Sequence, residues 1–502
     1  MKIALVFNPF TYKKHEENLR VVQKYFGLFP PLSLAWVAGI IRKAGHDVII
    51  IDARTLSLSL QQTAGILKKY RPDIIGAMMT TYMFPETLSW VKYLKNELHA
   101  SGIKVRTLIG GYNLRIYPLE SMTDPAIDFG CEEHAYFTVP ALLEALEAGR
   151  GDLSGVPGLL WRDKTGLRRN PHPQKIDFNA FPFPARDLLP NELYAEFPTQ
   201  RKNFTVMVTS LGCPHTCMFC EAGDTKYSPR DAVKVVDEMQ ECHDKYGVNE
   251  IDIFDYDFTA DKARAAAICR EIGSRGLKMT WACRSRVDNL DDAALKNMYS
   301  AGCRRIYWGI EHGDQKVLDG LNKKVSLERA AAVMKSSRAA GIQNLGFFLV
   351  GVPGETRESA RATVSFAKSL DLDYAQFSKL LAKPGTPLLA NMKKNGWRDY
   401  WADWVSGTET DRDLPRPWLD GISGEELGDM AKKAYLGFYA RPAFLVRHLL
   451  RCRSPFEILR KFFALMDMLC QSPAAGAGKK FRAYSENIIL VMREKTAWLR
   501  RS

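Results

Sequence analysis

The stretch Cys213-Pro-His-Thr-Cys217-Met-Phe-Cys220 decides how this chain is interpreted. Its three cysteines have the spacing C-x3-C-x2-C, and they follow an apolar, β-branched run at 204–211 that predicts a buried strand. Three thiolates on one loop can bind three irons of a [4Fe–4S] cluster, because soft sulfur ligands suit iron–sulfur centres. The fourth iron then has no cysteine and can accept a bidentate small molecule.

Zinc, a disulfide and chance spacing are the alternatives for this loop. A structural zinc site usually has four ligands, commonly arranged as two C-x2-C pairs. His215 lies inside the loop, but no second pair follows at the spacing of a zinc finger. The spacing therefore favours an iron–sulfur cluster over a zinc site.

Length and composition set the broad class of the protein. A chain of 502 residues is too long for one ordinary domain, and its hydrophobic fraction of 46% and charged fraction of 25% are those of a globular protein. No apolar run approaches the length of a membrane span, and the N-terminus lacks the pattern of a signal peptide, so we expect a cytoplasmic protein. The net charge of +13 allows anionic partners, although a solvated basic surface explains it most simply.

Residues 1–146 alternate strand and helix patterns, which predicts a doubly wound, Rossmann-like α/β domain with parallel strands. The expected strands are Lys2–Phe7, Asp47–Ile51, Ile74–Met79, Lys104–Ile109 and Ile127–Phe129. Ligands of such sheets lie beyond the carboxyl ends of the strands, where small and hydroxyl-bearing residues can approach a large cofactor. The candidate contacts in these loops are Asn8, Thr80, Thr81, Gly110, Gly111 and Tyr112.

Residues 147–203 are rich in glycine, proline and charge, which is typical of a linker. The segments Gly158–Trp161 and Leu167–Pro171 can form a small hairpin. Alternating prolines at 181–187 predict an extended strap. We assign this linker no chemistry.

Residues 204–395 contain six strand–helix repeats, which predicts a parallel sheet curled into a partial (β/α)6 barrel. The expected strands are Phe204–Thr209, Glu250–Asp255, Met279–Arg284, Arg304–Ile310, Leu345–Val350 and Ala375–Lys379. Active sites of α/β barrels lie at the carboxyl ends of the strands, and the cysteine loop follows the first strand. Polar residues that end the later strands therefore form a candidate site: Asp255, Arg284, Arg286, Glu311, Gly351–Glu355, Gln376 and Ser378.

Residues 396–502 are expected to be helical and say little about function. Trp397, Trp401 and Trp404 recur at helical spacing and are interpreted as core residues. Arginines and aromatic residues alternate over 441–463, which is the pattern of a basic amphipathic helix. This pattern favours a lipid-like or anionic small-molecule substrate and allows peripheral contact with a membrane.

The cysteine loop resembles the cluster loop of radical S-adenosylmethionine (SAM) enzymes, including the aromatic Phe219 before the last cysteine. The segment Gly309-Ile-Glu-His-Gly313 resembles a second motif of that family, with His312 in place of serine. The N-terminal third resembles the cobalamin-binding domain that precedes the cluster domain in one large subgroup. The matching pieces are 30–35, 43–46, 72–76, the double glycine at 110–111, and 138–143.

The resemblance implies the cofactors and the chemistry. Cys213, Cys217 and Cys220 would hold a [4Fe–4S] cluster whose open iron chelates SAM, and reductive cleavage of SAM would give a 5′-deoxyadenosyl radical. An external electron donor such as flavodoxin or ferredoxin would reduce the cluster. The implied SAM contacts are Phe219, Asp255, Arg286, Glu311, Gly351 and Pro353.

Cobalamin in the N-terminal domain would make methylation of an unactivated carbon the expected reaction, with radical cyclisation or rearrangement as the alternative. The first loop lacks the D-x-H-x-x-G pattern whose histidine binds cobalt in many such domains, and His46 lies at a predicted helix end. Histidine ligation of cobalt is therefore not expected. Outside this class, a non-enzymatic iron–sulfur carrier or sensor and a nucleic-acid-modifying protein remain as alternatives.

Overall fold

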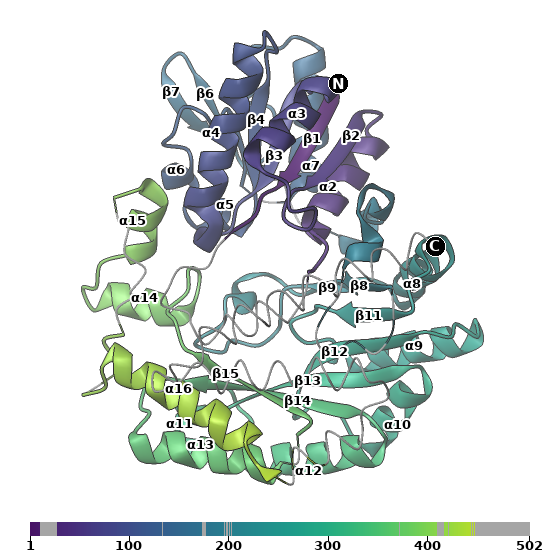
Figure 1. Cartoon of the computed structure of the whole chain (residues 1–502), viewed down its shortest axis with the longest axis vertical. Coiled ribbons are helices and arrows are strands. Elements are labelled where there is room, and N and C mark those ends of the chain that lie inside the picture. The colour runs from purple at the N-terminus through teal and green to yellow at the C-terminus, as the bar shows by residue number, and fades with distance from the viewer. Residues whose placement is uncertain are drawn as a thin grey trace, which may run out of the picture.

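The structure is a computed structural model. It describes residues 1–10, 28–408 and 416–446, except for positions 133, 173–176, 195, 197, 198, 200, 202, 371, 420, 443 and 445. Figure 1 shows an N-terminal α/β domain that lies over a curled second sheet, with helices from the C-terminal part of the described chain along one side of both.

The first sheet has seven strands in the order β2-β1-β3-β4-β5-β6-β7. Its strands are β1 Lys2–Phe7, β2 Asp47–Asp52, β3 Ile74–Met78, β4 Arg106–Gly110, β5 Phe129–Cys131, β6 Leu159–Asp163 and β7 Gly166–Arg169. The first five are parallel, as expected, and their order 2-1-3-4-5 is a doubly wound order with a switch point between β1 and β3. The hairpin β6–β7, which we placed in the linker, extends this sheet because β6 pairs antiparallel with β5.

Helices cover both faces of the first sheet. They are α2 Leu32–Lys43, α3 Leu60–Tyr70, α4 Phe84–Ala100 and α7 Ala135–Glu147, with the short helices η2 Thr81–Met83, α5 Tyr112–Ile116 and α6 Pro118–Ser121 after β3 and β4. Helices α2 and α7 pack together, as do α3 and α4. Ser59 and Gln62 form a capping box at the start of α3, which fixes where that helix begins. The sequence did not predict η2, α5 or α6.

The second sheet has six parallel strands in the order β15-β14-β13-β12-β11-β8, which confirms the predicted six units. The strands are β8 Phe204–Met207, β11 Glu250–Ile253, β12 Thr280–Arg286, β13 Cys303–Glu311, β14 Gln343–Val350 and β15 Tyr374–Lys379. The helices are α8 Ala232–Tyr246, α9 Lys262–Ser274, α10 Asp292–Ser300, α11 Gln315–Gly320, α12 Leu327–Ala339 and α13 Arg357–Ser369. β8 and β15 remain unpaired with each other, so the sheet is a half-barrel with its helices outside (Figure 1).

Short elements fill the connections. They are the 3-10 helices η3 Phe178–Ala180, η4 Arg186–Leu188, η5 Asn191–Leu193 and η6 Ala222–Asp224, and the paired strands β9 Ser210–Leu211 and β10 Ser228–Pro229. The C-terminal helices are α14 Pro387–Lys394, α15 Tyr400–Ser406 and α16 Gly424–Tyr439. Trp401 and Trp404 are core residues as predicted, whereas Trp397 is 45% exposed and is not. Most of the basic amphipathic pattern lies outside the described residues.

A shared hydrophobic core joins the carboxyl edge of the first sheet to the second domain. It contains Met79 and Ile109 from the first domain and Leu321 and Trp401 from the second. The indole of Trp404 donates a hydrogen bond to the carbonyl of Thr81 at 3.0 Å, and Tyr82 packs edge-on against Trp401. The loops of both domains that could bind cofactors therefore meet at one seam.

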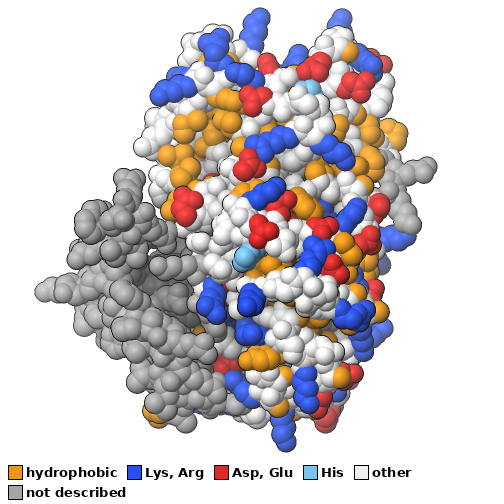
Figure 2. All heavy atoms as spheres, turned by 90° about the vertical axis from the view of Figure 1, so that its right-hand side faces the viewer, with side chains coloured by type: hydrophobic (Ala, Val, Ile, Leu, Met, Phe, Trp, Pro, Cys, Tyr) orange, Lys and Arg blue, Asp and Glu red, His pale blue; other side chains and the backbone are white. Residues whose placement is uncertain are grey.

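In the described part of the chain, no helix combines the length and apolarity that crossing a bilayer requires. On the face shown in Figure 2, basic and acidic side chains are interspersed. This distribution agrees with a solvated basic surface on that face.

Candidate active site at the seam of the two sheets

The cysteine loop begins at Gly212, where the backbone adopts φ +68°. A Cβ atom there would lie 2.2 Å from the carbonyl oxygen of Thr225, so only glycine fits this turn. Further along, the Met218 amide donates to Leu321 at 3.0 Å, and the Met218 carbonyl accepts from Leu388 at 3.0 Å. The loop is thus fixed by three separate segments of the half-barrel domain.

Each of the three thiols has a hydrogen-bond donor directed toward it. The backbone N–H of His215 is directed toward Cys213. The backbone N–H of Ala222 is directed toward Cys220, and its nitrogen lies 3.5 Å from the Cys220 sulfur. The guanidinium of Arg286 lies 3.9 Å from the Cys217 sulfur. Donors of this kind stabilise negatively charged sulfur ligands and tune their metal centres.

Burial disfavours free thiolates in this loop. It raises the pKa of Cys213 above its ordinary value and raises the pKa of Cys220 to about 12. A buried thiol of this kind becomes a thiolate when a metal centre compensates its charge. The donor set of the loop therefore fits a cationic iron–sulfur centre.

No three His, Cys, Asp or Glu side chains of the described residues converge closely enough to hold one metal ion. An iron–sulfur cluster makes a different demand, because each thiolate binds its own iron. The ligands of a cluster consequently surround a volume and do not need to meet at one point.

Glu311 ends β13 beside the loop and forms a buried ion pair with Lys323. Its carboxylate lies 2.7 Å from the Lys323 ammonium, and both side chains are at most 8% exposed. Glu311 adopts φ +70°, which is strained for a residue with a side chain. A Cβ atom at Gly309 would lie 2.7 Å from both charged groups, so glycine makes room for the pair. Strained backbone that carries a buried charge makes this strand end a candidate functional site.

Lys323 is a candidate site residue that the sequence analysis missed. It lies in the turn after α11, where Asn322 and Lys324 both adopt φ +54°. The Asn322 amide donates to the carbonyl of Thr216 at 2.8 Å, and Arg286 donates to the Lys323 carbonyl at 2.7 Å. This turn clamps the cysteine loop. Asn322 was the one available signal, because asparagine tolerates the left-handed conformation better than most residues.

Asp255 and Arg284 lie apart from the Glu311–Lys323 pair and have different tasks. The Asp255 carboxylate accepts bonds from the amide and hydroxyl of both Thr209 and Ser210, which fixes the segment that leads into the cysteine loop. Arg284 points into the barrel and pairs with Asp252. The structure places Arg284 in the barrel interior, and it gives Asp255 a supporting contact to the segment before the cysteine loop.

The other expected SAM contacts differ in their freedom to bind a ligand. Phe219 is half-buried, and the Lys323 ammonium lies 5.8 Å from its ring centre. Gly351 is already engaged, because its N–H donates to Glu355 and its carbonyl accepts from Trp418 at 2.9 Å. Pro353 is half-buried in the same turn. Contact of these residues with SAM remains a prediction.

The six expected cobalamin contacts lie in three loops at the carboxyl edge of the first sheet. Asn8 and Thr81 are buried, whereas Thr80, Gly110 and Tyr112 are half-buried and Gly111 is exposed. The loops after β1 and β3 flank the switch point, where doubly wound sheets bind ligands. Tyr112 extends from this edge to the second domain, because a Cβ atom on Gly385 would lie 2.1 Å from its oxygen. The edge therefore fits a cofactor held between the domains.

His46 lies at the opposite edge of the first sheet, where its imidazole pairs with Glu147 and contacts the amino group of Met1. It cannot reach the loops at the carboxyl edge. This position agrees with the expectation that His46 does not ligate cobalt, which stays a prediction. His15 lies outside the described residues.

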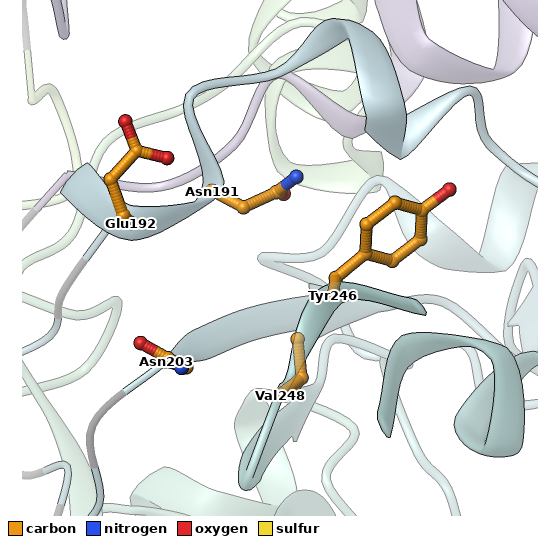
Figure 3. Close-up of a pocket in the computed structure, with 5 residues that line it drawn as sticks. All are labelled: Asn191, Glu192, Asn203, Tyr246 and Val248. Carbon is orange, nitrogen blue, oxygen red and sulfur yellow. The ribbon is translucent and has the colours of Figure 1, made fainter. Parts of the chain in front are cut away.

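Two surface hollows lie away from the cysteine loop. One has a volume of about 160 Å³ and is lined by Asn191, Glu192, Asn203, Tyr246 and Val248 at the amino ends of β8 and β11 (Figure 3). The other, of about 610 Å³, lies between α13 and α16 on the outer side of the half-barrel. The first lies at the amino ends of the strands, and the second approaches the carboxyl end of β14, at Val350 and Glu355, from the helical side.

Comparison with known proteins identifies both domains. The family model described as B12 binding domain matches residues 20–143, and that of the Radical SAM superfamily matches residues 207–367. An uncharacterized methyltransferase of Pyrococcus horikoshii is 33% identical over 89% of this chain and 94% of its own length. The cytidylyl-2-hydroxyethylphosphonate methyltransferase of Streptomyces wedmorensis is 26% identical over 82% of this chain and 86% of its own.

Solved structures share the fold. The radical SAM methyltransferase TsrM from Kitasatospora setae, with cobalamin and a [4Fe–4S] cluster bound, superimposes with a TM-score of 0.66 at 20% identity, covering 88% of this chain and 89% of its own. The cobalamin-dependent radical SAM enzyme OxsB superimposes with a TM-score of 0.68 at 15% identity. The match covers 97% of this chain and 75% of the OxsB chain. The protein is an enzyme, which sets aside an electron carrier or sensor, and it belongs to the radical SAM family whose members carry an N-terminal cobalamin-binding domain.

Proposed function

We propose that this enzyme transfers a methyl group to an unactivated carbon of a small molecule. One observation carries the proposal: the loops after β3 and β4 of the first sheet meet the cysteine loop region across the domain seam. Arg115 of the first domain donates to the Thr225 hydroxyl at 2.6 Å, five residues after the last cysteine of the loop. A substrate at this seam would reach both cofactors at once.

The residues of the chain have distinct roles in this proposal. Cys213, Cys217 and Cys220 hold the cluster. The Glu311–Lys323 pair presents one negative and one positive group, which complement the ammonium and carboxylate of a zwitterionic amino acid such as the methionine part of SAM. When bound, the reduced cluster would supply one electron to SAM, and methylcobalamin would supply the methyl group. The shared core at the seam excludes water from the space between them.

Radical cyclisation is the second candidate. The anaerobic magnesium-protoporphyrin IX monomethyl ester cyclase of Rubrivivax gelatinosus is 26% identical over 84% of this chain and 75% of its own length. The cyclase matches about as much of this chain as the Streptomyces methyltransferase does. Methylation and cyclisation are therefore compatible with the same architecture, and the substrate would decide between them. Label from SAM distinguishes them, because only methylation adds a methyl group to the product.

The test is anaerobic reconstitution of the full chain with iron, sulfide and hydroxocobalamin, followed by SAM carrying a deuterated methyl group and dithionite. Formation of 5′-deoxyadenosine would support radical chemistry, and deuterated methyl groups in small molecules of an added cell extract would support methylation. Cys217→Ala should abolish 5′-deoxyadenosine formation, whereas Cys269→Ala, in a buried thiol of α9, should retain it. Normal SAM cleavage by Cys217→Ala would refute the cluster assignment.

The partners follow from the same chemistry. A reductant such as flavodoxin or ferredoxin would supply the electron, and we expect the enzyme to work in the cytoplasm. The alternating arginines and aromatic residues of the sequence over 441–463 support a lipid-like or anionic substrate and allow peripheral membrane contact. Reduction of the cluster by purified flavodoxin tests the electron donor. Co-sedimentation with anionic vesicles tests the peripheral membrane contact.

A further inference from the structure

His312 is a buried side chain next to Glu311 for which the proposed reaction gives no role. Its Nε2 atom lies 3.0 Å from the Oε1 atom of Glu355, and both side chains are at most 1% exposed. Buried polar groups of this kind need hydrogen-bond partners within the protein. The motif that this segment resembles has serine instead of His312, and a serine hydroxyl ends two bonds nearer the backbone than Nε2. The histidine therefore provides a reach that serine lacks.

The hydrogen bonds of His312 fix which of its ring nitrogens carries the proton. The backbone N–H of Asp314 donates to Nδ1 at 3.1 Å, so Nδ1 is the acceptor and holds no proton. Nε2 therefore carries the proton and donates to Glu355. Asp314 is also the N-cap of α11, because its carboxylate accepts from the amides of Lys316 and Val317. His312 thus joins the start of α11 to the end of the neighbouring strand.

Glu355 uses its second oxygen to hold the turn after β14. The Oε2 atom accepts from the N–H groups of Gly351 and Val352, the latter at 3.4 Å. In the part of the chain that the structure describes, no lysine or arginine pairs with this carboxylate. Three N–H donors, one of them from His312, therefore compensate its buried charge. Loss of the His312 donor would leave the Oε1 atom without a partner.

The bond between His312 and Glu355 lies where the regular pairing of β13 and β14 stops. The register of the two strands shifts between Gly309 and Glu311, and the last paired residues are Glu311 and Phe348. Irregularities of this kind re-aim a side chain next to an active site. Just beyond the last pair, the side chains of His312 and Glu355 join the two strand ends.

We propose that His312 and Glu355 are positioning residues for SAM, and that their hydrogen bond sets the place of Glu311 relative to the turn after β14. This inference rests on the proposed function, in which Glu311 meets the ammonium of SAM. Both side chains of the pair are buried, so each acts through the backbone next to it. Binding groups that are held in place beforehand cost less entropy when the ligand arrives.

The test compares two substitutions of His312 that each keep one of its two hydrogen bonds. The amide nitrogen in His312→Gln reaches the place of Nε2 and donates to Glu355, whereas the shorter side chain in His312→Asn replaces the Nδ1 acceptor alone. The full chain is reconstituted with cluster and hydroxocobalamin and titrated with SAM in a calorimeter. Compared with the native Kd, we expect a value within about twofold for His312→Gln and about tenfold higher for His312→Asn. Equal Kd values for the two variants would overturn the inference.

A second hydrogen bond between the same two strands provides a matched control. The indole of Trp308 on β13 donates to the side-chain oxygen of Asn344 on β14 at 2.9 Å, and both residues are buried. Trp308→Phe removes this donor and should lower the free energy of unfolding, while the Kd for SAM stays within about twofold of native. Tenfold weaker binding by Trp308→Phe would mean that any loss of contact between β13 and β14 suffices, which would overturn the inference.

Amide hydrogen exchange of the cluster-loaded chain without SAM gives a readout that needs no ligand. The peptide over 343–356 should exchange faster in His312→Asn than in His312→Gln or the native chain, because the turn loses its fixed acceptor. Glu355→Gln has one oxygen in place of two, so it should show the same faster exchange and weaker SAM binding. Native exchange in both His312→Asn and Glu355→Gln would overturn the inference. A missing methylated product would count against the proposed function alone, since neither measurement depends on turnover.

Discussion

The two ends of the half-barrel both bury charged side chains, but they use them differently. At the carboxyl end, Glu311 and Lys323 form one pair on strained backbone beside the cysteine loop. In the amino half of the barrel interior, which we call the floor, charges from strands and linker neutralise one another. The floor consists of Glu196, Glu250, Asp252, Arg284, Arg305 and Tyr307.

The floor shows how such charges can serve stability alone. Arg284 pairs with Asp252, and its guanidinium carbon lies 3.8 Å from the ring centre of Phe254 and 4.7 Å from that of Tyr307. No residue of the floor adopts a left-handed backbone, whereas Glu311, Asn322 and Lys324 around the pair all do. Buried charge by itself therefore does not identify a site. Buried charge together with strained backbone and adjacent cysteine ligands does.

The largest expected effect on stability comes from removing a positively charged side chain of the floor, which tests the comparison between the two ends of the half-barrel. Arg305 is 1% exposed, and its guanidinium lies 3.5 Å from the Glu250 carboxylate. Breaking a buried pair by removing one partner costs about 3–5 kcal/mol, so Arg305→Met should lower the free energy of unfolding by that amount. Urea unfolding measures it. SAM cleavage per bound cluster should stay within about twofold of the native rate. A loss of cleavage with unchanged stability would contradict the division between the two ends.

At the carboxyl end we expect a loss of SAM cleavage in addition to the cost in stability of breaking a buried pair. Glu311→Gln keeps the shape of the side chain and removes the charge proposed to meet the ammonium of SAM. A hydrogen bond to a charged group contributes about 1.5–3 kcal/mol, so SAM cleavage should fall roughly 10- to 100-fold. Iron content should be unchanged. Arg361→Gln, on the exposed face of α13, is the matched control and should have the native rate. Equal rates for both variants would remove Glu311 from the site.

Sequence predicted the framework of this molecule because its signals are local. The β-branched runs and the caps Ser59, Asp261, Asp291 and Thr356 fixed where strands and helices begin. Cys213, Cys217 and Cys220 carried the chemistry through their spacing alone. The rest depended on contacts between distant segments. Lys323 joins the site through a turn that no periodicity marks. Arg284 does not join it, because its partner Asp252 lies within the neighbouring strand β11.

The floor also predicts a dependence of stability on pH. Burial, followed by the Asp252 charge, raises the pKa of Glu196 to about 8. Between the unfolded value of 4.5 and about 8, the folded chain holds a proton that the unfolded chain has lost, so stability falls as pH rises. The slope from this group is at most about 1.4 kcal/mol per pH unit. Glu196→Gln should remove this slope in urea unfolding at several pH values. An identical slope in Glu196→Gln would show that Glu196 is ionised in the folded protein.

The smallest effect concerns the double glycine of the first domain, which the sequence assigned to cofactor approach. Gly111 adopts φ +122°, and a Cβ atom there would lie 2.5 Å from the Met79 carbonyl oxygen. At Gly110 the nearest atom would be 3.8 Å away. Gly111→Ala should therefore lower the free energy of unfolding by about 1–2 kcal/mol, while Gly110→Ala should change it little.

Measuring cobalamin affinity of the same two variants separates packing from ligand approach. Gly111 is the residue before α5, which carries Tyr112, so strain at Gly111 should displace that ring and weaken cobalamin binding together with stability. If backbone approach to the cofactor is what both glycines provide, Gly110→Ala would weaken cobalamin binding just as much with no change in unfolding. The cobalamin affinity of Gly110→Ala thus decides what the first domain uses this position for. Native affinity would mean that the glycines serve the packing of the domain, as the charges of the floor do. Weakened affinity would mean that they serve a ligand, as we propose for the carboxyl end of the half-barrel.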